Sequence, residues 1–347
     1  MEKVYNLVVS FGSSMRFLVI GLGSMGKRRV RNLQKHGERD VIGFDVRKDR
    51  AEEANRLYGI QTFSDFGKAM NEKPSVFVIS CPPDKHLQYA DHALDNNLPF
   101  FSEVNTDTPQ NMEKFVKRVE KANGLLAAPS CTMRYHPCAA TIKNIIASRS
   151  LGDPLLLTYH SGENLEEWHP WEKVTDYYVG KKETGGGRDQ IAFELEWIRW
   201  LLGKATSVRA LTTKLSHSAA DIYDVYDLVL QFENKSVSNV LVDVIQRPAN
   251  RIFRLVCEDG VIHWDWMSHY VRVYNAKENK LLEIPERPGY KGYLVEEMYE
   301  DEIKQFLSSL KDHNKKYPLT FTDELDIVNI VYASEQSSEA GREIRLK

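Results

Sequence analysis

A glycine pattern near the start of the chain constrains the fold more than any other feature. Residues 17–20 (Phe-Leu-Val-Ile) are typical of a buried parallel strand, and Gly-Leu-Gly-Ser-Met-Gly follows at 21–26. In such a turn the first glycine permits the tight bend, the second lets a pyrophosphate approach the backbone, and the third lets the next helix pack on the strand. The N–H groups at the helix start suit a phosphate anion. We therefore expect a dinucleotide to bind through Gly21, Gly23, Ser24, Met25 and Gly26.

An acidic residue follows at the spacing that this motif uses to recognise the adenosine ribose. The apolar residues 41–44 lead directly to Asp45, about 20 residues after the glycines. A carboxylate there accepts hydrogen bonds from the ribose 2′-hydroxyl and repels a 2′-phosphate, so we expect NAD. Arg47 lies close behind and could turn towards a 2′-phosphate, which leaves NADP open. A solvated loop cation is the simpler interpretation of Arg47.

The composition gives no reason to expect nucleic acid or a membrane as a partner. The chain has 347 residues, 42% of them hydrophobic, and a formal net charge of -3. No apolar run is long enough for a membrane span. The four cysteines lack metal-ligand or redox spacing, so we expect no metal and a cytoplasmic protein with reduced thiols. Residues 1–14 do not resemble a signal peptide, and we interpret them as an extension, either an edge strand or a frayed arm.

The order of predicted elements indicates two domains. Strands and helices alternate over residues 15–135, which predicts a Rossmann domain with a doubly wound parallel sheet. Residues 136–347 predict an α+β domain built on a large, mainly antiparallel open sheet, because several strands follow one another without helices between them. One face of that sheet needs a cover other than the chain's own helices. We therefore expect a homo-oligomer, a dimer or a tetramer.

Several further motifs are similar to those of one family, the glucose–fructose oxidoreductase, inositol dehydrogenase and MocA family of NAD(P)-dependent oxidoreductases. They are Pro-Pro at 82–83, Arg-Tyr-His-Pro at 134–137, Trp-His-Pro at 168–170, the triple glycine at 185–187 and Gln-Arg-Pro at 246–248. The sequence resembles most the members linked to sugar-nucleotide and polysaccharide metabolism. The resemblance implies hydride transfer between the nicotinamide and a sugar, a sugar nucleotide or a sugar-derived acid. It also implies cofactor contacts from Cys81, Pro82, Pro83, His86 and Glu103.

The usual acid–base residues of that family are missing. Val104 occupies the position of the family's lysine in Glu-Lys-Pro, and Phe193 the position of its helix histidine. Neither side chain can exchange a proton. Three explanations stay open: another group transfers the proton, the protein binds nucleotide and sugar without turnover, or it runs a different nicotinamide reaction such as oxidation followed by elimination. The replacement candidates are Glu194, His169, Lys182 and Tyr178, and each has an ordinary structural interpretation as well.

Three residues are candidates for substrate binding. Arg134 and His136 follow the last Rossmann strand, where the domains should meet, and Arg134 suits an anionic group or an interdomain ion pair equally well. Trp168 belongs to an aromatic loop that could stack on a sugar ring or simply pack. We interpret Trp264 and Trp266 as neighbours on one strand face, in the core or in an interface.

Overall fold

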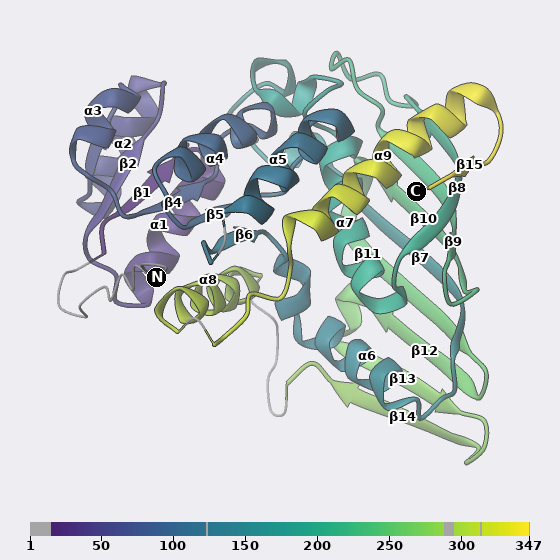
Figure 1. The fold of residues 1–347 in the computed structure, drawn as a ribbon. Helices are drawn as coiled ribbons and strands as arrows, with labels where there is room; N and C mark the ends of the chain where they lie inside the picture. Colours follow the sequence, from purple (N-terminus) through teal and green to yellow (C-terminus); the bar gives the residue numbers. More distant parts are fainter. Residues whose placement is uncertain (1–14, 123, 288–294, 313, 347) are drawn as a thin grey trace, which may run out of the picture.

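The computed structural model describes residues 15–122, 124–287, 295–312 and 314–346. The predicted N-terminal extension, residues 1–14, lies outside the described residues. Figure 1 shows two sheets with helices around them. The glycine-rich turn lies beside the first of these sheets, between β1 and α1. No helix in the described ranges combines the length and the hydrophobicity that crossing a bilayer requires.

The first sheet has six parallel strands in the order β3-β2-β1-β4-β5-β6. Residues in β1, β2 and β4 are buried at every position, as expected for strands covered on both faces. This sheet confirms the predicted Rossmann architecture. The strands are β1 Phe17–Ile20, β2 Val41–Phe44, β3 Gln61–Phe63, β4 Val76–Ile79, β5 Phe100–Ser102 and β6 Ala127–Pro129; the helices between them are α1 Ser24–Lys35, α2 Lys48–Tyr58, α3 Phe66–Asn71, α4 His86–Asp95 and α5 Pro109–Lys121.

The second sheet has nine strands in the order β14-β13-β12-β11-β7-β10-β9-β8-β15. Among the described strands of this second sheet, only β7 and β10 pair in parallel, so the sheet is mainly antiparallel, as predicted. Its strands are β7 Pro154–Asn164, β8 Ala205–Thr213, β9 Val225–Phe232, β10 Val237–Asp243, β11 Ile245–Cys257, β12 Gly260–Asp265, β13 Tyr270–Asn275, β14 Lys280–Pro285 and β15 Ile344–Arg345.

Three helices cover one face of this sheet: α6 Pro137–Ser148, α7 Gly187–Leu202 and α9 Phe321–Ala340. Figure 1 shows them in front of the strands, with α9 in yellow crossing β8. The core between these layers contains the aromatic side chains Tyr159, Trp197, Phe253 and Trp264, all nearly inaccessible to solvent. The opposite face exposes apolar side chains, among them Leu211, Val229 and Ile252.

The C-terminal helices return to the first sheet and complete its core. Helix α8, Glu296–Lys311, contributes Ile303, Phe306 and Leu307 to the cluster around β1 and β4. At the start of α9, the Phe321 ring lies 5.0 Å from the Phe115 ring and 5.6 Å from the Phe100 ring. The last third of the chain therefore helps to hold the sheet that carries the glycine-rich turn.

Two details of the second sheet differ from the sequence expectations. Strand β14 was not expected, because its mostly exposed residues have no alternating apolar pattern. Trp264 and Trp266 do not share a strand face: β12 ends at Asp265, and Trp266 begins a short 3-10 turn, Trp266–Ser268. Trp264 is a core residue, which is one of the two alternatives expected for it, whereas Trp266 is only partly buried.

A buried arginine joins three parts of the chain beside the first sheet. The Arg29 guanidinium on α1 pairs with Glu103 after β5, at 2.6 Å, and with Glu302 on α8, at 2.7 Å. It also lies 4.6 Å from the centre of the Phe101 ring. Neither Arg29 nor Glu302 is accessible to solvent. Removing one partner of such a group leaves a buried charge uncompensated.

We expect Arg29→Ala to lower the free energy of unfolding by about 3–5 kcal/mol, because Glu103 and Glu302 lose their shared cation. Arg31 on the same helix pairs with Glu296 at the surface, so Arg31→Ala should cost less than about 1 kcal/mol. Urea denaturation followed by circular dichroism measures both. Equal losses in the two variants would contradict the structural importance of the buried cluster.

Candidate active site

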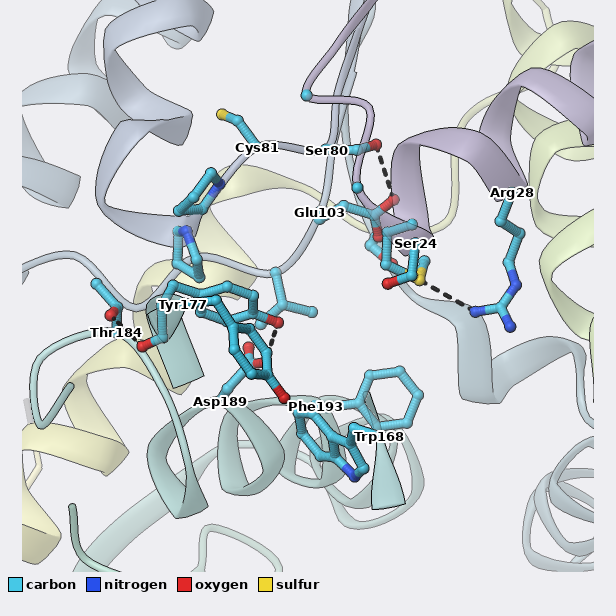
Figure 2. A pocket seen from close by; sticks show the side chains of 18 of the residues that line it. Ser24, Arg28, Ser80, Cys81, Glu103, Trp168, Tyr177, Thr184, Asp189 and Phe193 are labelled. Atoms are coloured by element: carbon cyan, nitrogen blue, oxygen red, sulfur yellow. Dashed lines mark hydrogen bonds between the residues drawn. The ribbon is translucent and has the colours of Figure 1, made fainter. Parts of the chain in front are cut away.

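A cavity of about 910 Å³ opens between the two sheets, at the carboxyl ends of β1, β2 and β4. Parallel sheets bind their ligands at this edge. Side chains from both regions line the cavity, as Figure 2 shows for Ser24, Glu103, Trp168, Asp189 and Phe193. It is also lined by the predicted cofactor residues Gly21, Gly23, Ser24, Met25, Asp45, Arg47, Cys81, Pro82, Pro83, His86 and Glu103.

The three glycines of the turn meet different surroundings. Gly21 has φ +87°, and a Cβ there would lie 2.5 Å from the Cys81 backbone. A Cβ on Gly26 would lie 1.7 Å from the Gly21 carbonyl oxygen, so α1 can begin this close to the strand only with glycine. Gly23 instead faces the cavity, and the nearest atom to its Cβ position is Arg50 Nη1, at 3.4 Å. Open space therefore lies beside Gly23 and the N–H groups that open α1, an arrangement that suits an anion such as a diphosphate.

Asp45 is held by the backbone around it. Its Oδ2 accepts from the Leu22 N–H at 2.7 Å and its Oδ1 from the Arg47 N–H at 2.8 Å, and the residue is only 5% exposed. The Arg47 guanidinium is bound by Asp49 at 2.6 Å and by Glu172 at 2.9 Å. Asp45, Asp49 and Glu172 therefore gather around Arg47, and this negative charge favours a ribose with a free hydroxyl over one with a 2′-phosphate.

The loop after β4 supplies a buried histidine. His86 Nε2 lies 2.7 Å from the Cys81 carbonyl oxygen, and burial lowers the pKa of the ring, so the imidazole is neutral. A neutral ring that donates through Nε2 leaves Nδ1 as an acceptor. Nδ1 has no hydrogen-bond partner within the described part of the chain. Burial also raises the pKa of the Cys81 thiol, so the thiol keeps its proton at neutral pH.

The Val104–Asn105 departure from the family motif has a structural partner on α9. The Asn105 N–H donates to Glu324 Oε1 at 3.0 Å and its Nδ2 donates to Glu324 Oε2 at 2.9 Å. The family's proline could not donate the first of these bonds. Burial raises the pKa of Glu324 to about 8. Val104 lines the cavity and offers no polar group.

Helix α7 places the carboxylate of Asp189 in the cavity. Asp189 lies four residues before Phe193, on the same helix face, and both line the cavity. Tyr178 donates to Asp189 Oδ2 at 3.2 Å. Burial, reinforced by Glu103 and Glu163, raises the pKa of Asp189 to about 7. Burial also holds the pKa of Tyr178 well above its usual value, so the hydroxyl keeps its proton.

Glu194, a candidate acid–base group, faces the core instead of the cavity. Its carboxylate is inaccessible and accepts hydrogen bonds from Tyr159, Ser161, Gln190, Trp197 and Arg251, at 2.6–3.1 Å. Five donors leave no free lone pair for a substrate. The geometry therefore argues against proton transfer by Glu194 and makes it an anchor for its neighbours.

The aromatic loop, which contains Trp168, His169 and Tyr177, lies beside the glycine-rich turn at one end of the cavity. His169 Nε2 is 3.0 Å from the Ser24 hydroxyl oxygen, and its ring stacks on Tyr177 at 4.7 Å. Glu172 pairs with Arg47 at 2.9 Å and with Arg50 at 3.4 Å. His169 therefore lies beside the glycine-rich turn, away from α7, and a role at the cofactor suits its position better than acid–base catalysis. Trp168 lines the cavity near Glu163.

Besides Glu194 and Gly26, three more predicted site residues do not line the cavity. Lys182 lies 4.4 Å from the centre of the Tyr223 ring, near the surface. Arg134 pairs with Glu196 at 2.6 Å and donates to the Pro318 carbonyl, which matches the ion-pair alternative. His136 is buried 3.2 Å from Glu286, and its Nδ1 accepts from the Cys138 N–H. Each of these side chains is occupied by its neighbours.

Some cavity residues were not singled out from the sequence. Gln190 was within reach of sequence reasoning, since helical spacing places it near the Phe193 face. Glu163, Asn250 and Arg251 lie on β7 and β11, which pair across the sheet although they are far apart in the chain. No local pattern marks those three.

Comparison with protein families gives two matches in order along the chain. Residues 15–128 match the oxidoreductase family with an NAD-binding Rossmann fold, and residues 139–263 match the GFO/IDH/MocA C-terminal domain. A comparison with curated protein sequences finds no match.

Solved structures share the fold at low sequence identity. Levoglucosan dehydrogenase in complex with NADH and levoglucosan is 16% identical, with a TM-score of 0.85 over 96% of this chain and 99% of that one. An Agrobacterium radiobacter oxidoreductase in complex with NAD+, L-tartaric acid and magnesium is 15% identical, with a TM-score of 0.84 over 96% and 98%. The WlbA dehydrogenase from Bordetella pertussis, in complex with NADH and UDP-GlcNAcA, is 17% identical, with a TM-score of 0.79 over 96% and 99%. The two matches and the paired sheets place this NAD-binding chain in the GFO/IDH/MocA family of oxidoreductases.

Proposed function

We propose that the protein is an NAD-dependent dehydrogenase that oxidises a CH–OH group of a sugar-like molecule, with Asp189 as the proton acceptor. The observation that carries this proposal is the Asp189–Tyr178 pair in the cavity, at the place where the family histidine is lost. Similar structures hold levoglucosan or UDP-GlcNAcA beside NADH, which supports a carbohydrate as the substrate class.

The chain's own atoms fit the cofactor. The space beside Gly23 would take the diphosphate against the N–H groups of α1, and Asp45 would bind the adenosine ribose. The unpartnered His86 Nδ1 offers an acceptor in the same cavity. When bound, NAD takes up the hydride that leaves the alcohol carbon.

Asp189 is the group that accepts the proton of the substrate hydroxyl. Its Oδ2 already accepts from Tyr178, which leaves Oδ1 to take the proton of the substrate hydroxyl. A base with a pKa of about 7 is ionised over half of the time at neutral pH or above and still holds a proton well enough to return it. Tyr178 stays protonated and orients the carboxylate. Phe193 and Val104 contribute apolar walls that keep water from the reacting atoms.

The open face of the nine-stranded sheet supports an oligomer. Leu211, Val229 and Ile252 lie on it at 57%, 44% and 41% exposure, and large apolar side chains gathered on one exposed sheet face are typical of an interface. We propose that a second copy of the chain covers this face. Light scattering in solution tests the assembly, since a mass of one 39.9 kDa chain would contradict it.

Asp189→Asn should lower kcat for sugar oxidation by about 10²–10⁴-fold, because the amide cannot accept the proton. In the wild type, kcat/KM should rise as pH increases through about 7 and then level, since Asp189 must lose its proton to act. NAD affinity should stay unchanged in the variant. Initial rates of NADH formation across a panel of sugars and pH values provide the measurement.

Glu183→Gln, at an exposed position of the same loop region, is the matched control and should keep wild-type rates. Wild-type rates in Asp189→Asn would exclude Asp189 as the base. No turnover of any sugar by a wild-type protein that binds NAD tightly would favour the non-catalytic alternative.

Asp45→Ala should weaken NAD binding about tenfold to a hundredfold, and NADP binding much less. Loss of the bonds from Leu22 and Arg47 affects both cofactors, so the ratio of the two dissociation constants isolates the ribose contact. Calorimetry measures both constants, with Glu52→Ala on the surface of α2 as the control. An unchanged ratio would remove the reason for preferring NAD.

A further inference from the structure

The substrate end of the cavity carries a charge pattern that limits what it can bind. This inference rests on the proposed function and concerns the side chains around Asp189. They are Glu163, Gln190, Asn250, Arg251 and Trp266.

Arg251 is a cation whose charge is already balanced. Its Nε and Nη2 lie 2.9 Å and 2.8 Å from Glu194 Oε1, and the guanidinium lies 4.7 Å from the centre of the Trp266 ring. Its Nη1 donates no hydrogen bond within the described residues. Arg251 therefore presents N–H donors to the cavity, held in a fixed plane, rather than an uncompensated positive charge.

Glu163 is half-buried and lies beside Arg251 and the Trp168 indole. Burial raises the pKa of this carboxyl, whereas Arg251 and the Trp168 indole N–H lower it. The buried Trp168 Nε1 has no partner at good hydrogen-bonding geometry in the described part of the chain. A ligand is a natural partner for this polar edge of the cavity, because buried polar groups are normally paired.

The other cations that line the cavity do not offset these carboxylates. Arg28 pairs with Glu296 at 2.9 Å, and Arg47 and Arg50 pair with Glu172. Lys85 pairs with Asp84 at 3.1 Å, and Lys181 is exposed at the cavity surface. A carboxylate or phosphate brought up to Asp189 would therefore meet Glu163 and Asp189 without a free buried cation among the described residues, and such burial is costly.

We propose that the substrate group bound next to Asp189 is an uncharged vicinal diol, and that Glu163 excludes sugar acids and nucleotide-linked sugars. One hydroxyl accepts from Arg251 Nη1 and its neighbour donates to Glu163, while the Trp266 ring borders the apolar side of the sugar. This donor–acceptor pair distinguishes a neutral polyol from an acid of the same shape.

The test compares neutral sugars with their matched uronic acids and UDP-linked forms, for example glucose, glucuronate and UDP-glucose. NADH formation gives kcat/KM, and calorimetry on the NADH-loaded protein gives affinity without turnover. We expect at least tenfold preference for the neutral member in the wild type. Glu163→Gln should reduce that preference at least tenfold, whereas Glu166→Gln, exposed three residues later, should leave it unchanged.

The outcomes separate this inference from the proposed function. Neutral sugars that bind the NADH-loaded protein without being oxidised would support the inference and contradict the function. A wild-type preference for the acid or the UDP-linked sugar, or no binding of any neutral member, would overturn the inference. A Glu163→Gln variant that loses NAD+ affinity and keeps the sugar preference would also overturn it, since the carboxylate would then serve the cationic nicotinamide.

Discussion

The close approach of α1 to the turn after β1 is the constraint on which the rest of the site depends. A single methyl group at residue 26 would lie 1.7 Å from the Gly21 carbonyl oxygen, so only glycine allows the helix to start there. Because α1 starts there, its N–H groups face the cavity and Leu22 can bind Asp45. The same helix carries Arg29, whose ion pairs with Glu103 and Glu302 connect it to β5 and α8. The cofactor end of the cavity and the packing of the first sheet therefore share one geometric origin.

Helix α7 positions the side chains at the other end of the cavity, around Asp189. Residues 189 and 194 are five positions apart, so they point in different directions around the helix. Asp189 faces the cavity with Tyr178, and Glu194 faces the core, where it binds Arg251 and fixes that guanidinium against Trp266. The loss of the family lysine and histidine thus does not leave the cavity without ionisable groups. Two carboxylates remain in the cavity close to the positions of the lost groups: Glu103 beside Val104, and Asp189 one turn before Phe193.

Much of the fold was accessible from the sequence because its signals are local. Short stretches of sequence are enough to identify the glycine turn, the apolar strands of the first sheet and the alternating residues of β9. Strand β14 has no such signal because its residues are mostly exposed, and β15 has only two residues. The return of α8 to the first sheet depends on contacts with residues almost 300 positions earlier, which periodicity alone does not reveal.

Only part of the candidate site could be predicted from the sequence. Cofactor residues follow from a motif, whereas the orientation of loop residues does not: Tyr178 points into the cavity and Lys182, four residues later, points to the surface. Arg251 and Glu163 become neighbours only when β11 pairs with β7.

The proposed activity depends most on a dinucleotide that lies across the turn beside Gly23. Calorimetry of NAD binding to the purified protein and to Gly23→Val tests this directly, because a valine side chain would fill the space proposed for the diphosphate. We predict one NAD bound per wild-type chain and no measurable binding to the variant with its fold intact by circular dichroism. Equal affinity in both proteins, or none in the wild type, would contradict the account.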